Sequence, residues 1–363
     1  MSPGLQTTTP GKTPEDEPSR NGAELPFDDG ACLDTAQLVQ LERSFRHWAG
    51  ASRRQDIRLA RRRILLIFLL IRHTGAKLNE ILRLDPFTDI DTQSVCIHDP
   101  TSPEPCTRRI SIAETLSQEI RATLDDPNFR SSLTKLFAVD PAFVRRKFYE
   151  CAEACGLPKR LSGPEMIRRA RAVELVRGNM PLPAVQQLLG HSTPNLTTAH
   201  VSFSDEELRQ MAKLFIERES SRKTSARNAF FGKIIEIRRG DIQARVTLMN
   251  PSGHRIASII TSESLDRLDL HLGRLITAEV KAPWILLQQG PAPVGCSADN
   301  RLRGEIIRIN RGKVSSEYVL RIDSGTELCA LISTKHDTVK SLTVGEKVWA
   351  LFNAFAVILH ADD

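Results

Sequence analysis

A unit of about 65 residues is written twice in the C-terminal part of the chain, and this repeat constrains the fold more than any other feature. Segment 225–228 (SARN) returns 72 residues later as segment 297–300 (SADN). The same offset carries Gly232 onto Gly304. Landmarks that keep one register without a gap indicate a duplicated structural unit, rather than two unrelated segments rich in strands.

Each copy has the pattern of a small β unit. In the first copy, runs 232–238 and 244–249 are rich in branched apolar residues and are separated by a glycine turn. A short helical piece at 262–268 follows, and strands at 276–281 and 284–287 complete the unit. Five short strands in so few residues predict a closed barrel of the oligonucleotide-binding type, because closure removes exposed edges. We therefore expect two such barrels in tandem.

The rest of the chain reads as helical. Asp34 is placed to cap a helix, and the apolar run 64–71 predicts a buried helix because it is far shorter than the roughly 20 residues that cross a bilayer. Runs 94–98 and 108–112 predict a β-hairpin. The fold class we expect is multidomain: a mainly α domain with a small hairpin, then two all-β barrels. The predicted parts are a disordered tail at 1–30, the helical domain at 31–220, and barrels at 225–290 and 297–363.

Composition adds limits on the environment and partners. The 363 residues are 40% hydrophobic and 26% charged, as in ordinary globular proteins, with a net charge of +6 that is compatible with nucleic acid. The first thirty residues have no apolar run of the kind found in signal peptides. Seven cysteines lie apart without a zinc pattern, so we expect reduced thiols, no bound metal ion and a cytoplasmic location, with no membrane contact.

Motifs in the first copy closely resemble the Mop (TOBE) domain, which binds molybdate and tungstate. They are SARN, the strand beginning GKI, the stretch IITSES and the tripeptide VKA. A duplicated pair resembles the di-Mop module of molybdate-responsive regulators. The resemblance implies oxyanion ligands at Ser225, Arg227, Thr261, Ser264 and Lys281. Hydroxyls and cations of this kind suit a tetrahedral dianion, which needs fixed donors and positive charge.

The second copy departs from this set. Asp299 replaces the arginine, His336 replaces a serine and Asn353 replaces the lysine, while Ser297 and Ser333 remain. These changes remove two positive charges and add a negative one. We therefore predict a complete site in the first copy alone, and one oxyanion per chain. The alternative is that Arg227 and Lys281 are solvated cations at strand ends.

Stretch 183–200, with its Leu-Gly-His box, resembles the catalytic domain of tyrosine recombinases (phage integrases) over roughly residues 34 to 215. By that resemblance Lys77 stands for the first family arginine, Glu165 and Arg168 for the second box, His191 for the third, and His200 for the nucleophilic tyrosine. The two tyrosines, Tyr149 and Tyr318, lie elsewhere.

The departures from the recombinase pattern predict a domain that binds DNA without cutting it. A lysine cannot reproduce the bidentate contact of an arginine with phosphate. Glu165 would place a negative charge beside the phosphate, and a covalent phosphotyrosine is not available at His200. Lys77, Arg168 and His191 are expected to contact duplex DNA. A phosphohistidine route through His200 stays as an alternative, as does a merely solvated face for the eight arginines at 43–63.

The whole architecture resembles tungsten-responsive transcriptional regulators. The resemblance implies a non-enzymatic, homodimeric one-component switch that senses tungstate or molybdate and binds operators of oxyanion-uptake genes. Two alternatives remain: an active site-specific recombinase, and a molybdate or tungstate storage protein. The sequence ranks neither the two oxyanions nor the direction of the ligand's effect on DNA binding.

Overall fold

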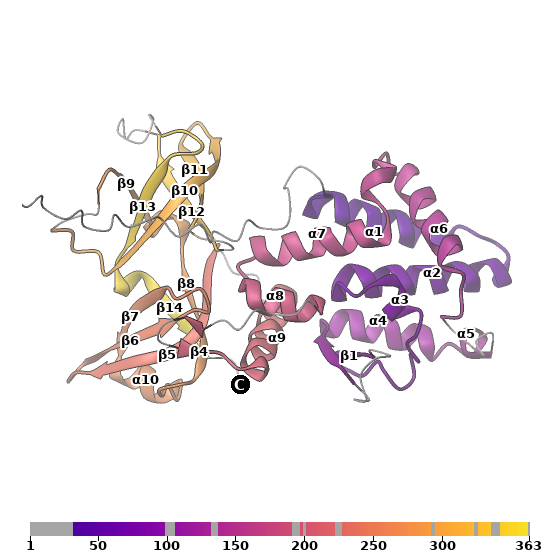
Figure 1. Cartoon of the computed structure of the whole chain (residues 1–363), viewed down its shortest axis with the longest axis horizontal. Coiled ribbons are helices and arrows are strands. Elements are labelled where there is room, and N and C mark those ends of the chain that lie inside the picture. Colours follow the sequence, from indigo (N-terminus) through magenta and orange to yellow (C-terminus); the bar gives the residue numbers. More distant parts are fainter. Residues whose placement is uncertain are drawn as a thin grey trace, which may run out of the picture.

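The computed structural model describes residues 32–98, 106–131, 137–190, 197–198, 201–221, 227–291, 295–322, 326–334 and 342–361. A helical part and a β part lie side by side along the long axis of the molecule (Figure 1). The expected disordered tail at 1–30 lies outside the described residues. Within the described ranges, no helix has the length and apolar character needed to cross a membrane.

The N-terminal part is mainly α, as the sequence predicts. In its core the rings of Phe45 and Phe68 stack with 4.0 Å between ring centroids, and Phe148 packs edge-on against both. The elements are α1 (Thr35–Gly50), α2 (Gln55–Thr74), α3 (Leu78–Ile81), β1 (Ser94–Ile97), β2 (Arg108–Ser111), α4 (Glu114–Leu124), α5 (Pro127–Ser131), α6 (Pro141–Glu153), η2 (Lys159–Leu161), α7 (Pro164–Arg177), α8 (Leu182–Leu189), β3 (Thr197–Thr198), β4 (Val201–Ser202) and α9 (Asp205–Ser221).

Local sequence signals explain where these helices begin and which face they bury. The Asp34 carboxylate accepts a hydrogen bond from the Gln37 amide, and the Gln37 side chain accepts one from the Asp34 amide. This reciprocal cap confirms the predicted start of α1. The described side chains of 64–71 are almost all buried within α2, so the predicted buried helix is also confirmed.

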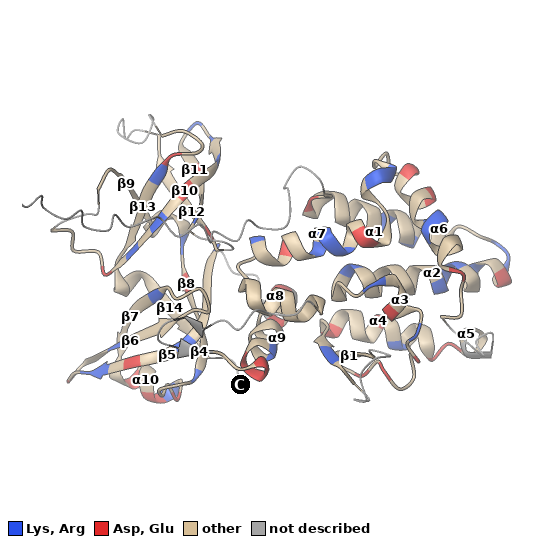
Figure 2. Cartoon of the chain, in the orientation of Figure 1, with Lys and Arg blue, Asp and Glu red and all other residues tan. Residues whose placement is uncertain are grey.

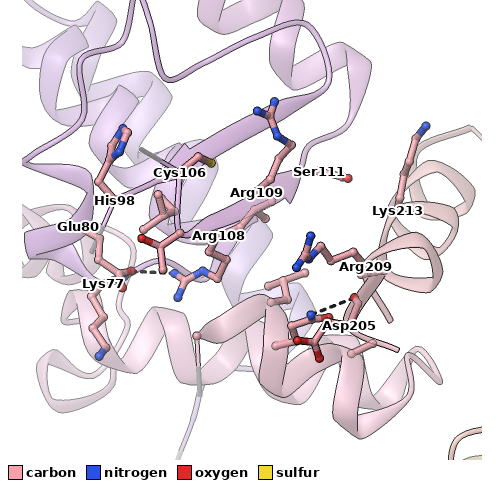
Figure 3. A pocket seen from close by; sticks show the side chains of 18 of the residues that line it. Lys77, Glu80, His98, Cys106, Arg108, Arg109, Ser111, Asp205, Arg209 and Lys213 are labelled. Atoms are coloured by element: carbon pink, nitrogen blue, oxygen red, sulfur yellow. Dashed lines mark hydrogen bonds and ion pairs between the residues drawn. The ribbon is translucent and has the colours of Figure 1, made fainter. Parts of the chain in front are cut away.

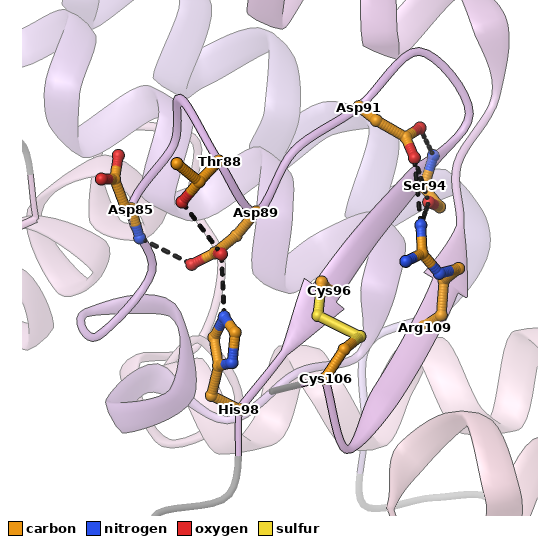
Figure 4. The surroundings of a disulfide bond; sticks show 9 residues. All are labelled: Asp85, Thr88, Asp89, Asp91, Ser94, Cys96, His98, Cys106 and Arg109. Atoms are coloured by element: carbon orange, nitrogen blue, oxygen red, sulfur yellow. Dashed lines mark hydrogen bonds and ion pairs between the residues drawn. A yellow bond between two sulfur atoms is a disulfide. The ribbon is translucent and has the colours of Figure 1, made fainter. Parts of the chain in front are cut away.

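The predicted hairpin is present, with Cys96 on β1 paired opposite Arg109 on β2. Cys96 and Cys106 form a disulfide with 5.6 Å between their Cα atoms (Figure 4). The expectation of seven reduced thiols is therefore wrong for these two residues. They are ten positions apart in sequence, but antiparallel pairing brings them together, which linear spacing did not reveal.

The C-terminal part contains two five-stranded antiparallel sheets of equivalent topology. The first copy supplies β5 (Asn228–Arg239), β6 (Gln243–Met249), β7 (Arg255–Thr261), α10 (Ser262–Arg267), β8 (Leu275–Val280), η3 (Ala282–Trp284) and β9 (Leu286–Gln289). The second copy supplies β10 (Asn300–Arg311), β11 (Ser315–Arg321), β12 (Glu327–Ser333), β13 (Lys347–Phe352), η4 (Ala354–Ala356) and β14 (Val357–His360).

The two copies exchange their last strands. Strand β14 pairs with β8 in the sheet of the first copy, and β9 pairs with β13 in the sheet of the second. The prediction that residues 284–287 complete their own barrel is therefore wrong, because β9 extends to Gln289 and joins the sheet of the second copy. Branched apolar residues predict a strand, but they do not say which sheet edge it joins. A turn of 3-10 helix redirects the chain toward the other sheet in each copy.

The two sheets share one hydrophobic core rather than enclosing two separate ones. The ring of Phe230 on β5 stacks on Phe352 of β13, with 6.2 Å between ring centroids. The two edges of the first sheet also approach each other, because the Ser258 hydroxyl donates to the Val357 carbonyl at 2.8 Å. Each half-barrel is thus completed by the other copy.

Strand β5 also connects the β part to the helical part. Phe231 follows Phe230 and faces the opposite way, where it contacts Phe215 of α9 at 5.6 Å between ring centroids. The Lys233 ammonium pairs with Glu207 of α9. On the second copy, the Glu327 amide donates to the Asn179 side chain in the loop after α7. Both copies therefore contact the helical domain.

Candidate oxyanion site and DNA-binding surface

Arg227 and Lys281 lie beside each other at one end of the first β unit. In the antiparallel pairing of β5 with β8, Asn228 is opposite Val280. Arg227 and Lys281 each stand one residue beyond this pair, so their backbones are neighbours. Both residues are exposed. Two cations on adjacent strand ends make a surface that favours a dianion.

Thr261 and Ser264 lie at the opposite end of the same unit. The Thr261 hydroxyl caps α10 by accepting from the Ser264 amide at 3.1 Å, and it donates to the Ser264 hydroxyl at 2.9 Å. Thr261 pairs with Gln243, at the β6 end that is next to Arg239 of β5. Arg227 precedes the other end of that strand.

One chain therefore does not bring the predicted oxyanion ligands together. The two groups are separated by the length of β5, which spans 12 residues, or up to roughly 36 Å if fully extended. Ser225 lies outside the described residues. We name Arg227 and Lys281 the cationic half-site of the predicted oxyanion site, and Thr261 and Ser264 its hydroxyl half-site.

Apolar side chains are exposed next to both half-sites. Trp284 and Leu286, which follow Lys281, are 59% and 65% exposed. Ile242 is 78% exposed, and its carbonyl accepts from the Ser262 amide beside Thr261. Exposed apolar residues next to polar ligands are typical of surfaces that another protein covers.

In the second copy, Asp299 stands at the position equivalent to Arg227, and its carboxylate makes contacts within the β part. Its carboxylate accepts from the Ala354 amide at 3.0 Å and pairs with Arg245 at 2.7 Å. Burial would raise the pKa of Asp299, but these two interactions outweigh it and hold the pKa below its usual value. Asn353 caps η4, and His336 lies outside the described residues. A negative charge therefore stands where the first copy has a cation.

The recombinase-like positions are only partly described. Lys77 is exposed before α3, whereas Glu165 is 72% exposed and pairs with Arg168. Arg168 is buried, and its guanidinium also donates to the carbonyls of Gly75 and Leu189 at 2.8 and 3.0 Å. These contacts hold the C-terminal ends of α2 and α8 together. His191 and His200 lie outside the described residues.

A hollow of about 1350 Å³ opens beside Lys77, between the hairpin, α3, α8 and α9 (Figure 3). The acidic residues that line it are Glu80 of α3 and, in the first turn of α9 (Figure 2), Asp205 and Glu206. Five further cations line the hollow, and the sequence reasoning did not single them out: Arg83, Arg108, Arg109, Arg209 and Lys213. The adjacent arginines on the predicted hairpin strand were the available signal for two of them.

Arg108 lies in the middle of the residues labelled around this hollow (Figure 3). It pairs with Glu80 at 2.9 Å, and a side chain at Gly190, the glycine of the Leu-Gly-His box, would collide with its guanidinium. Burial lowers the pKa of Arg108, with a smaller lowering from nearby Arg168, while Glu80 acts in the opposite direction. The hairpin thus places an arginine beside the recombinase-like second and third boxes.

Comparison with known proteins supports the reading of the repeat. Residues 224–287 and 296–359 each match the model of the TOBE domain, which confirms the predicted resemblance. The transcriptional regulator ModE of Yersinia pestis is 39% identical over 140 residues, which are 38% of this chain and 53% of ModE. The chain thus spans about half the length of this relative.

Solved structures give similar chains for both parts. The cytoplasmic molybdate-binding protein ModG, solved with molybdate bound, is 33% identical, covers 39% of this chain and 100% of its own, and has a TM-score of 0.37. The XerH site-specific recombinase bound to its difH substrate is 20% identical, covers 52% of this chain and 54% of its own, and has a TM-score of 0.39.

Proposed function

We propose that this protein is a one-component transcriptional regulator that senses tungstate or molybdate through its TOBE repeat and binds operator DNA through its helical domain. The observation that carries the proposal is the placement of Arg227 opposite Lys281 across β5 and β8. The matching positions of the second copy hold Asp299 and Asn353. A dianion is therefore favoured in the first copy and disfavoured in the second.

We further propose that two chains complete each oxyanion site. The cationic half-site of one protomer would meet the hydroxyl half-site of its partner, and the exposed Trp284, Leu286 and Ile242 would be covered by the contact. In a two-fold dimer both meetings occur at once, because the interface is isologous. The dimer would thus hold two sites, which is one oxyanion per chain.

DNA would lie against the cationic hollow of the helical domain. Lys77, Arg108 and Arg109 would supply phosphate contacts, while buried Arg168 would position the helices that carry them. We propose no strand cleavage, because His200 stands at the nucleophile position. A two-fold dimer would read an inverted repeat, and its action would be in the cytoplasm.

Strand β5 offers a physical route between the two functions. Its first residue follows Arg227. Two of its own residues, Phe230 and Phe231, contact the shared β core and α9 respectively. An oxyanion that binds one arrangement of the dimer more tightly than another would increase the population of that arrangement. If the two arrangements differ in their affinity for DNA, oxyanion binding would change DNA binding.

Two measurements test the proposal. Calorimetry with tungstate, molybdate and sulfate should show tight binding of one or both metal oxyanions and none of sulfate. Lys281→Ala should abolish the binding, whereas Asn353→Ala, at the matching position of the second copy, should leave it intact. A gel shift with promoter DNA of oxyanion-uptake genes should show binding whose midpoint changes with the oxyanion. Absence of both signals would overturn the proposal.

A further inference from the structure

The Arg227 guanidinium is engaged by a carboxylate from the other β unit. Glu317 on β11 of the second copy forms an ion pair with it. The Arg227 side chain is 64% exposed, but that of Glu317 is only 16% exposed. The arginine of the cationic half-site is therefore accessible from solvent on one side and held by a nearly buried anion on the other.

Glu317 is fixed by contacts that do not depend on Arg227. The Asn310 side-chain amide donates to its Oε2 at 2.6 Å, and the Cys329 thiol donates to its Oε1 at 3.4 Å. Burial raises the pKa of the Cys329 thiol, which keeps the proton needed for this bond. The carboxylate would thus keep hydrogen-bond partners if Arg227 turned away.

The second copy carries the same ion pair with its charges exchanged. Residues 227 and 317 correspond to residues 299 and 245 by the repeat offset, and Asp299 pairs with Arg245 at 2.7 Å. The two units are therefore joined by two equivalent contacts of opposite polarity. Only the contact at Arg227 combines a predicted oxyanion ligand with a competing carboxylate.

We propose that Glu317 is a built-in competitor that sets the affinity of the site for its oxyanion. This inference rests on the proposed oxyanion function of Arg227. A dianion and a carboxylate next to one guanidinium repel each other, so the oxyanion must take over the arginine from Glu317. Binding then breaks a contact between the two β units, which links occupancy of the site to their packing.

Calorimetry of the full chain with molybdate and tungstate tests the role of Glu317. Glu317→Gln keeps the shape and can still accept from Asn310, but it removes the competing charge. We expect it to bind the oxyanion about tenfold more tightly, the size of one lost charge-assisted interaction. Glu317→Asp, which keeps the charge on a shorter side chain, should fall between wild type and Glu317→Gln.

Asp299→Asn is the matched control, because it removes one negative charge from the equivalent contact of the other polarity. We expect it to leave oxyanion affinity unchanged. Unchanged or weaker binding by Glu317→Gln, or equal tightening by both variants, would overturn the inference while leaving the proposed function intact. Absence of binding by wild type and by all variants would overturn the proposed function and this inference with it.

Discussion

Asn228 and Asn300 hold equivalent positions in the two β units and make the same contact in opposite directions. The Asn228 side chain accepts from the Cys329 amide at 2.6 Å and donates to the Cys329 carbonyl at 2.9 Å. The Asn300 side chain contacts the amide and carbonyl of Ala257 in the same way, at 2.8 and 3.0 Å. Each asparagine therefore acts as a hydrogen-bonding partner for a strand of the other unit.

Asn228→Ala should destabilise the β part strongly. Asn228 and Asn300 are both buried, and truncation would leave backbone groups of the other unit without a partner. We expect a loss of about 2–4 kcal/mol in the free energy of unfolding. Chemical denaturation followed by circular dichroism measures it. Asn310→Ala, at a more exposed asparagine of β10, should cost much less, and equal losses would contradict the argument.

The repeat illustrates what the sequence could and could not predict. The 72-residue offset located the strands and the asymmetry at Asp299 and Asn353. It did not show that β9 and β14 change places, because a strand's composition does not identify its pairing partner. The roles of Asn228 and Glu317 were also missed, since both act across a contact between residues 90 or more positions apart.

The helical domain shows the same limit. The recombinase-like boxes predicted that Lys77 and Arg168 contact DNA, but the burial of Arg168 under two backbone carbonyls depends on tertiary packing. Cations contributed by the hairpin and α9 become part of one surface only after folding.

Arg109→Gln should lower the affinity for DNA and make that affinity less dependent on salt concentration. Arg109 lines the hollow, is 59% exposed and pairs with Asp91. Loss of one phosphate contact should lower the slope of log affinity against log salt by about 1. Fluorescence anisotropy over a salt series measures this slope. Arg238→Gln removes a 75% exposed arginine from β5, away from the hollow, and should leave the slope unchanged. If Arg109→Gln and Arg238→Gln gave the same slope of log affinity against log salt, the hollow would be excluded as the surface that binds DNA.

Glu174→Gln should change the acid stability of the helical domain. Glu174 on α7 accepts from Arg72 of α2 and Arg171 of α7, and Arg171 also pairs with Glu219 of α9. Burial on its own would raise the pKa of Glu174, but the two arginines outweigh it and lower the pKa from 4.5 to about 2. The stabilisation is therefore present above the unfolded pKa near 4.5 and is lost as pH falls toward 2.

At pH 7 the free energy of unfolding of the wild type should be about 3–5 kcal/mol larger than that of Glu174→Gln, because the variant removes the carboxylate that pairs with two buried arginines. That advantage should shrink by about 2 kcal/mol at pH 3. Urea denaturation at both pH values provides the comparison, with Glu153→Gln on α6 as an exposed control. A difference that is independent of pH would contradict the low pKa of Glu174.

Cys96→Ser should loosen the hairpin that borders the hollow. Removal of the cross-link to Cys106 enlarges the unfolded ensemble, and we expect a loss of about 2–3 kcal/mol for a loop of this length. Reductant should lower the unfolding midpoint of wild type but not of the variant. Thiol titration of the denatured, unreduced chain should find five of the seven cysteines reactive, and seven would contradict the disulfide.

The most direct test of the central claim mixes two defective variants. Arg227→Ala removes the arginine of the cationic half-site, and Thr261→Val/Ser264→Ala removes both hydroxyls of the hydroxyl half-site. If two chains share each site, a mixed dimer has one doubly defective site and one intact site. Equal co-expression should then restore about one quarter of the sites found in wild type by calorimetry, although neither variant binds alone. Restoration of none of the sites, with mixed dimers present, would contradict a site shared between two chains.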